Sequence, residues 1–161
     1  MNSLLQTTSA DQDELRRKLE LIKKGKHDSK LARDESVLVR NALAAKGYEL
    51  DILVNDKNWM VRETLAKNGY KLDSLVLDSK PEVRMEVAKQ GYGLEILVND
   101  ESPKVKIQVA KQGYGLNKLI NDSDWTVRAT VAKQGYGLDK LVNDSNMYVR
   151  MEAKKKLKEL K

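Results

Sequence analysis

The sequence contains no cysteine, which excludes disulfides, thiolate metal sites, iron–sulfur clusters and cysteine nucleophiles. Phenylalanine is also absent, so we expect an aliphatic core with some tyrosine. His27 is the only histidine, and we interpret it as an incidental surface residue that can build neither a catalytic triad nor a metal cluster. No apolar run approaches the roughly 20 residues that span a bilayer, and the first ten residues do not resemble a signal peptide. We therefore expect a cytoplasmic protein with no cofactor, metal, membrane contact or small-molecule substrate.

What the sequence does contain is a tandem repeat with a period of 22, marked by Gly-Tyr pairs and by one position each for Asp, Val and Arg or Lys. The Gly-Tyr pairs begin at Gly47, Gly69, Gly91, Gly113 and Gly135. The Asp positions are Asp34, Asp56, Asp78, Asp100, Asp122 and Asp144, and each Asp is followed at a constant distance by a Val-Arg or Val-Lys pair. A fixed period of this kind indicates stacked supersecondary units that share a core.

One unit, residues 78–99, shows how each repeat should fold. Pro81 stands where the first helical residue is expected, because its missing N–H has no partner there in any case. The preceding residue is then the N-cap, and the six N-caps are expected at Ser36, Asn58, Lys80, Ser102, Asp124 and Asn146. The helix should run about ten residues and end at the Gly, which tolerates the left-handed conformation that terminates helices. The following Leu-x-x-Leu-Val leaves room for one short turn of the 3₁₀ type.

The predicted core is aliphatic and continuous from repeat to repeat. Val83, Val87 and Ala88 fall on one side of the helix, and they join Leu94 and Leu97 of the short turn. One unit could not bury this face alone, whereas stacking buries it, and each buried Leu or Val should contribute roughly 1.5–3 kcal/mol. The fold class is therefore all-α, a right-handed α-solenoid with helical caps.

The charge distribution supports capped ends. The net charge of +6 comes from residues 1–33 and 151–161, because residues 34–150 carry 17 bases and 17 acids. We divide the chain into a disordered N-terminus (1–10), a degenerate capping repeat (11–33), the array with six Asp-to-Arg segments (34–150) and a basic capping helix end (151–161). Charged ends keep a solenoid soluble, and a phosphate-tracking protein would instead carry a basic stripe along the array.

The pattern D-x4-V-R-x2-V-A-x2-G…L-x2-L, as in residues 122–132, resembles the leucine-rich repeat variant (LRV) family over residues 34–150. It is similar, more loosely, to HEAT-type repeats. The resemblance implies a short α-helix alternating with a 3₁₀ helix in a right-handed superhelix, and an interaction role without a defined activity. The unit here is shorter than the family norm, and the family's iron–sulfur domain would need cysteines that this chain lacks.

Two ladders are expected to serve the scaffold. Each Arg of the Asp/Arg ladder could belong to a binding row, but we favour a contact to an Asp or a backbone carbonyl of a neighbouring repeat. The tyrosines that follow the helix-ending glycines could stack on bases. We favour packing back on the last helical turn, because apolar residues commonly do this at that position.

The candidate binding face lies opposite the Val/Ala core. The positions four and seven after each Asp differ between repeats while the core does not, and several are apolar despite an expected outward position. Exposed Trp and Met are typical of interface centres. Alternatively, this face curls inward and is partly self-buried. The candidate partner-binding residues are Trp59, Met60, Glu63, Lys67, Met85, Lys89, Ile107, Lys111, Trp125, Lys133 and Tyr148.

These residues predict a non-catalytic protein–protein interaction module whose partner is another macromolecule. The alternative is a binder of nucleic acid or of an anionic surface, through the Lys ladder and the basic ends. We expect no enzyme, because the acids fall at repeat positions or helix starts and no glycine-rich phosphate loop is present.

Overall fold

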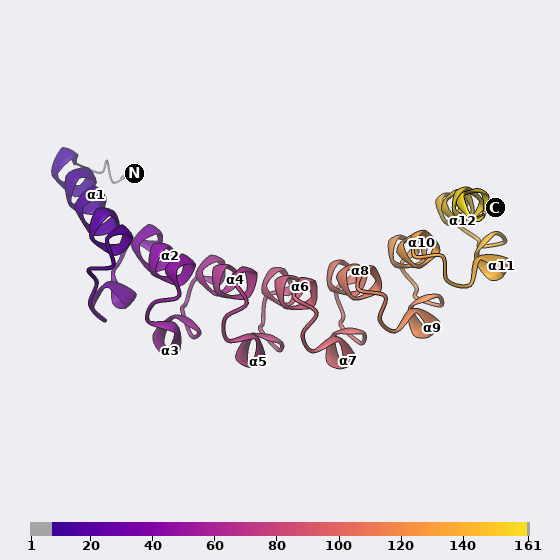
Figure 1. The fold of residues 1–161 in the computed structure, drawn as a ribbon, viewed down its shortest axis with the longest axis horizontal. Coiled ribbons are helices and arrows are strands. Elements are labelled where there is room, and N and C mark those ends of the chain that lie inside the picture. Colours follow the sequence, from indigo (N-terminus) through magenta and orange to yellow (C-terminus); the bar gives the residue numbers. More distant parts are fainter. Residues whose placement is uncertain (1–7, 161) are drawn as a thin grey trace, which may run out of the picture. The chain divides into compact units, whose positions relative to one another are not determined.

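Helices and the connections between them make up the whole described part of the chain. The computed structural model describes residues 8–160, and these contain twelve α-helices, one 3₁₀ helix and no strand. The chain forms two compact units, Met1–Lys71 and Leu72–Lys161. Each unit is a helical repeat in which long and short helices alternate, which agrees with the predicted all-α class (Figure 1).

The first unit begins with the degenerate repeat. Its elements are α1 (Ser9–Lys23), the 3₁₀ helix η1 (Leu31–Arg33), α2 (Val37–Lys46), α3 (Leu50–Leu53) and α4 (Trp59–Lys67). Helix α1 packs on α2, α2 packs on α4, and the short α3 contacts both α2 and α4. Residues 1–10 were expected to be disordered. Residues 1–7 lie outside the described residues, whereas Thr8 is the N-cap of α1 and the helix begins at Ser9.

The second unit continues the same alternation. Its elements are α5 (Leu72–Leu75), α6 (Pro81–Lys89), α7 (Leu94–Leu97), α8 (Pro103–Lys111), α9 (Leu116–Leu119), α10 (Trp125–Lys133), α11 (Leu138–Leu141) and α12 (Met147–Glu159). The long helices pack in chain order, α6 on α8, α8 on α10 and α10 on α12. Each of α7, α9 and α11 contacts the two long helices that flank it in the sequence. The expected basic end at 151–161 is part of the single helix α12 as far as Glu159.

The predicted helix boundaries are confirmed. All six expected N-cap residues cap their long helices, with Asn58, Asp124 and Asn146 also accepting a hydrogen bond from a first-turn amide. At the other end, Gly91 adopts φ +74°, and its N–H donates to Ala88 O while Tyr92 N–H donates to Val87 O. This pair of bonds is the glycine-terminated helix end that the sequence predicted.

The short second element differs from the prediction, because it is α-helical and not 3₁₀. In α3, Leu53 N–H donates to Glu49 O and Val54 N–H to Leu50 O, which is the i→i−4 pattern, and i→i−3 bonds occur at both ends. A left-handed N-cap precedes the turn, at Glu49 in α3 and at Gly93 in α7. This residue turns the chain sharply enough that the following four residues complete one α-turn.

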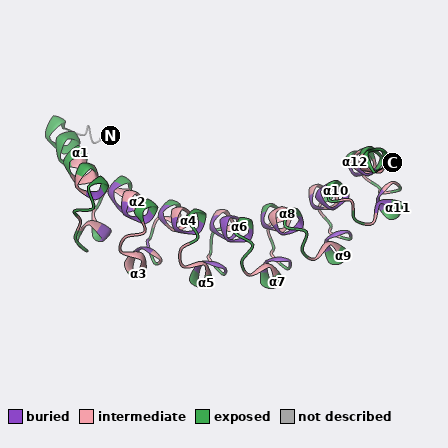
Figure 2. Cartoon of the chain, viewed as in Figure 1, coloured by how far each residue is buried: buried purple, intermediate pink, exposed green. Residues whose placement is uncertain are grey.

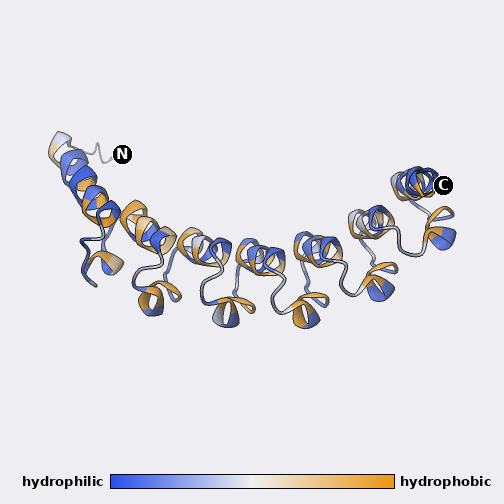
Figure 3. Cartoon of the chain, viewed as in Figure 1, coloured by the Kyte–Doolittle hydropathy of each residue, from blue (hydrophilic) through white to orange (hydrophobic). Residues whose placement is uncertain are grey.

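The aliphatic core occupies most of the predicted positions within each unit, but Leu94, which was predicted to belong to it, is only half-buried. Val39, Leu43 and Ala44 of the first unit are fully buried, as are Val83, Val87 and Ala88 of the second. The leucines that end the short helices, such as Leu53 and Leu97, are also fully buried. Figure 2 shows buried segments in both the long and the short helices. Figure 3 shows that the long helices carry both apolar and polar residues.

Candidate functional site

The Asp/Arg ladder is an internal brace in both units. Arg40 Nε lies 2.6 Å from Asp56 Oδ2, and Arg40 Nη2 lies 3.0 Å from Asp56 Oδ1. The same two bonds, at 2.6–2.7 Å and 2.9 Å, join Arg84 to Asp100 and Arg128 to Asp144, always 16 residues apart. Bidentate pairing of this kind fixes orientation as well as distance.

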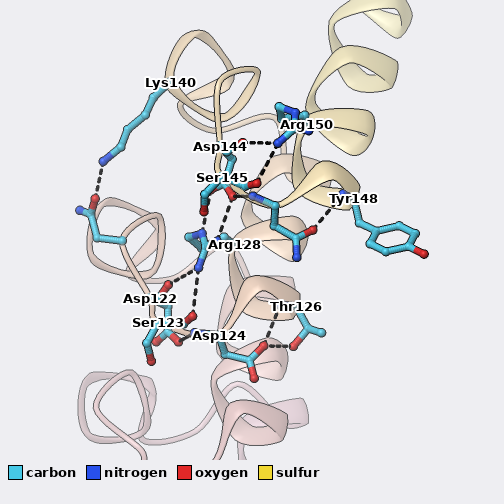
Figure 4. Close-up of polar contacts among 12 residues, drawn as sticks. Asp122, Ser123, Asp124, Thr126, Arg128, Lys140, Asp144, Ser145, Tyr148 and Arg150 are labelled. Atoms are coloured by element: carbon cyan, nitrogen blue, oxygen red, sulfur yellow. Dashed lines mark hydrogen bonds and ion pairs between the residues drawn. The ribbon is translucent and has the colours of Figure 1, made fainter.

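Each arginine also holds the loop that precedes its own helix. Arg128 Nη1 donates to the carbonyls of Asp122 (2.7 Å) and Ser123 (3.1 Å), so its guanidinium lies between two loops (Figure 4). The hydrogen bond from Arg128 lowers the pKa of Asp144 below its ordinary value. These contacts confirm the structural interpretation of the ladder, and the arginines that make them are held inside the scaffold.

One rung of the ladder was missed by the sequence analysis. Lys18 in α1 lies 2.7 Å from Asp34 Oδ2, again 16 residues apart. It stands one full repeat period before Arg40, so the period itself could have revealed it. The degenerate repeat therefore keeps the brace although most of its other repeat positions are polar.

Lys106 makes fewer hydrogen bonds than Arg84 and Arg128, the arginine rungs of the second unit, and offers a direct test. Its Nζ makes one hydrogen bond to Asp122 Oδ2 at 2.5 Å, where arginine makes two bonds to Asp and one or two to carbonyls. We expect Lys106→Arg to raise the free energy of unfolding by about 1 kcal/mol, since the planar guanidinium pairs in two places. Urea denaturation measures this, with Lys111→Arg at an exposed site as the matched control. An equal change in both variants would contradict the role assigned to the rung.

The tyrosine ladder behaves differently in the two units. In the first unit Tyr70 packs over Gly47, so closely that a Cβ on that glycine would lie 2.8 Å from the hydroxyl. In the second unit a Cβ added to Gly91 or Gly113 would meet no atom within 4 Å. Tyr92, Tyr114 and Tyr136 are exposed. Tyr70 thus contacts the helix-ending glycine of the preceding repeat, and the predicted packing of each tyrosine on the last turn of its own helix stays a prediction.

His27 is not the surface residue that the sequence analysis expected. Its ring stacks on Tyr48 with the ring centroids 3.9 Å apart, and Nδ1 lies 3.5 Å from Glu49 Oε1. The side chain is half-buried in the first unit, between the degenerate repeat and the next.

In the first unit, the candidate residues lie on α4. Met60 is exposed, whereas Trp59 and Glu63 are half-buried. Lys67 is exposed, and its Nζ lies 3.0 Å from Glu63 Oε1. The four residues thus combine an exposed apolar side chain with a charge pair on one helix.

In the second unit the candidate residues occupy the four long helices. Tyr148 and Trp125 are 54% and 41% exposed, and their rings stack with the centroids 5.3 Å apart. Figure 4 shows Tyr148 projecting away from the ladder. Met85 and Ile107 are only half-buried, so the variable face is neither fully outward nor internal.

The lysine row is largely offset by neighbouring acids. Lys89 Nζ lies 2.7 Å from Glu86 Oε1, and Lys133 Nζ lies 3.6 Å from Glu152 Oε1. Lys111 is exposed and forms no ion pair with any residue in the described range. A row whose members pair with carboxylates presents less positive potential than the sequence suggested.

The positions seven after each Asp require a correction. Ala129 is buried and Asn41 is half-buried with a buried Oδ1 that lacks a hydrogen-bond partner in the described structure, whereas Met151 is exposed. The next long helix of the same unit approaches this position, and α12 has no such neighbour in the described chain. The outward position predicted from a single helical wheel therefore applies to Met151 alone of these three.

Two further properties bear on function. Among residues 8–160 no group of three or more His, Asp or Glu side chains could hold a metal ion. No helix in that range is both long and apolar enough to cross a bilayer.

Comparison with protein-family models gives no match, and comparison with curated proteins gives none either.

Proposed function

We propose that the chain is a non-catalytic protein–protein interaction module, built as a right-handed α-solenoid of the LRV type with looser similarity to HEAT repeats. The observation that carries the proposal is the stacked pair Trp125 and Tyr148, which remains exposed on the repeat scaffold. Large aromatic side chains on a surface are costly in water and are enriched at interface centres. A cytoplasmic location belongs to the same proposal.

The division between repeated and variable residues also supports a binding role, because the repeated residues hold the repeats together and leave the variable ones free for recognition. The Val/Ala/Leu core and the Asp/Arg ladder recur in the complete repeats, with Lys106 in place of one Arg, whereas Trp125, Tyr148 and Met60 occupy positions that change. Specificity in a repeat protein resides in such variable positions. The alternative, binding of nucleic acid or another anionic surface through the Lys row, is weakened by the carboxylates beside Lys67, Lys89 and Lys133.

Site-specific photo-crosslinking in cells tests the proposal. We expect a benzophenone side chain at position 148 to capture a protein, and the same side chain at Asn117, exposed on α9, to capture none. Trp125→Glu should reduce the capture at position 148 at least tenfold, because it places a charge in the aromatic pair. Met85 is unsuitable for this purpose, since a change at a half-buried residue mixes binding with stability.

Two results would reject the proposal. One is equal capture at positions 148 and 117, which would indicate unspecific collision. The other is loss of all capture after nuclease treatment, together with a gel shift of single-stranded nucleic acid that falls steeply with salt, which would favour the alternative.

A further inference from the structure

The last long helix, α12, exposes two positions, Met151 and Lys154, whose equivalents on α10 are buried. Met147, Met151, Lys154 and Lys158 follow one another at helical spacings of four, three and four, so they form one stripe. This stripe lies opposite Val149 and Ala153, which are fully buried against the unit. Met147 is 53% exposed and Met151 is 59% exposed. Figure 2 shows that most of α12 is exposed.

The preceding helix shows what covers two positions of this stripe, whereas Trp125, the equivalent of Met147, is 41% exposed although α12 packs on α10. In α10 the equivalents of Met151 and Lys154 are Ala129 and Ala132, which are 6% and 0% exposed because α12 packs on α10. The covering element in this unit is thus another helix. Met151 and Lys154 are exposed because no such helix packs on α12 among the described residues.

The covering helix also shows which charge suits the site. Glu152 of α12 places its carboxylate 3.6 Å from Lys133 Nζ of α10. The residue equivalent to Lys133 on α12 is Lys155, which is exposed and has no ion-pair partner in the described range. Lys154, Lys155 and Lys158 thus place positive charge beside the exposed Met147 and Met151. A molecule that binds there should carry acidic residues, because opposite charges across an interface attract.

Another copy of this chain is a poor occupant. Position 154 is a lysine, whereas the equivalent residues of the other long helices of the second unit, Ala88, Ala110 and Ala132, are fully buried. Two α12 helices would bring lysines of both copies together, which is repulsive. Helix α1 offers no match either, since none of its large apolar residues is exposed.

We infer that the stripe Met147, Met151, Lys154 and Lys158 docks an acidic amphipathic helix of a partner protein. Its apolar face covers the two methionines, and its carboxylates pair with Lys154, Lys155 and Lys158, as in other helix-in-groove contacts. Methionine suits this use because its flexible thioether adapts to different partners. The inference adds a second surface to the proposed function and does not require the Trp125–Tyr148 pair.

A designed peptide tests the inference on the full chain. The probe is a synthetic helix-forming peptide with Val, Ala and Leu at the spacing of Val149, Ala153 and Leu157, and with Glu at the flanking positions. Methyl NMR of the chain's five methionines reports the location of binding. We expect the signals of Met147 and Met151 to shift and those of Met60 and Met85 to stay. Lys154→Glu combined with Lys158→Glu should weaken binding at least tenfold, and Met147→Glu is a second variant at the first helical residue.

Matched controls decide between occupants. The same peptide with Lys in place of each Glu should bind at least tenfold more weakly, and phosphatidylcholine–phosphatidylserine vesicles and a single-stranded DNA oligomer should leave the two signals unchanged. Equal binding of both peptides would overturn the inference, as would shifts caused by the vesicles or the DNA. Concentration-dependent shifts without any probe, abolished by Met151→Glu, would identify a second copy instead. Crosslinking at position 148 is read separately, so a failure here is distinguishable from failure of the proposed function.

Discussion

Replacement of Asp56 by alanine should destabilise the first unit by about 3–5 kcal/mol, the usual cost of leaving one member of a buried ion pair alone. The side chains of Arg40 and Asp56 are 3% and 4% exposed, so water does not replace the lost partner. The same change removes the acceptor of Asn58 N–H, at 2.8 Å, and so weakens the start of α4. Urea denaturation followed by far-UV circular dichroism measures the loss.

Two companion variants separate the causes. Asp56→Asn keeps an acceptor for Asn58 N–H but removes the charge, so it should recover only the smaller, capping part of the loss. Arg40→Met combined with Asp56→Ala should cost less than the sum of the two single changes, because no charge is then left buried alone. A single-variant loss under about 1 kcal/mol would show that the pair behaves as a surface salt bridge.

Gly115→Ala is the second change with a large expected effect, a loss of about 2–5 kcal/mol from backbone strain and overpacking together. Gly115 has φ +62°, a conformation that costs alanine about 1–2 kcal/mol. An added Cβ would also overlap Cγ2 of Val98, which ends the preceding short helix, and overpacking adds about 1–3 kcal/mol. Thermal and urea unfolding both report the difference.

Gly113→Ala is the matched control for this prediction. Gly113 has φ +74°, but nothing lies within 4 Å of its added Cβ, so only the conformational cost of about 1–2 kcal/mol remains. Val98→Ala should partly rescue Gly115→Ala by removing the overlapping methyl group. Equal losses at positions 113 and 115 would mean that the approach of the short helices to one another is looser than the structure shows.

Much of each unit could be predicted because the relevant signals are local and repeated. The N-cap positions, the glycine helix ends and the Val/Ala/Leu core depend on spacing within one repeat, and apart from the half-buried Leu94 they are where the sequence placed them. The ion pair of Lys18 with Asp34 could have been predicted in the same way, since Lys18 lies one repeat period before Arg40.

The candidate site was harder to predict, because exposure depends on neighbours that a helical wheel does not contain. Ala129 and Met151 occupy equivalent positions, yet one is buried by α12 and the other is exposed. Likewise the tyrosines occupy identical sequence positions, but Tyr70 packs on a glycine while Tyr114 is exposed. Trp125 and Tyr148 belong to successive repeats and form a pair only because α10 and α12 pack together.

The sequence by itself determined the period, the helix limits and the composition of the core, since each follows from propensities and spacing inside a single repeat. Only the tertiary structure decided which side chains stay in water, because that depends on how closely the next helix approaches. The aromatic pair and the uncovered stripe of α12 therefore emerged from packing and not from the repeat pattern.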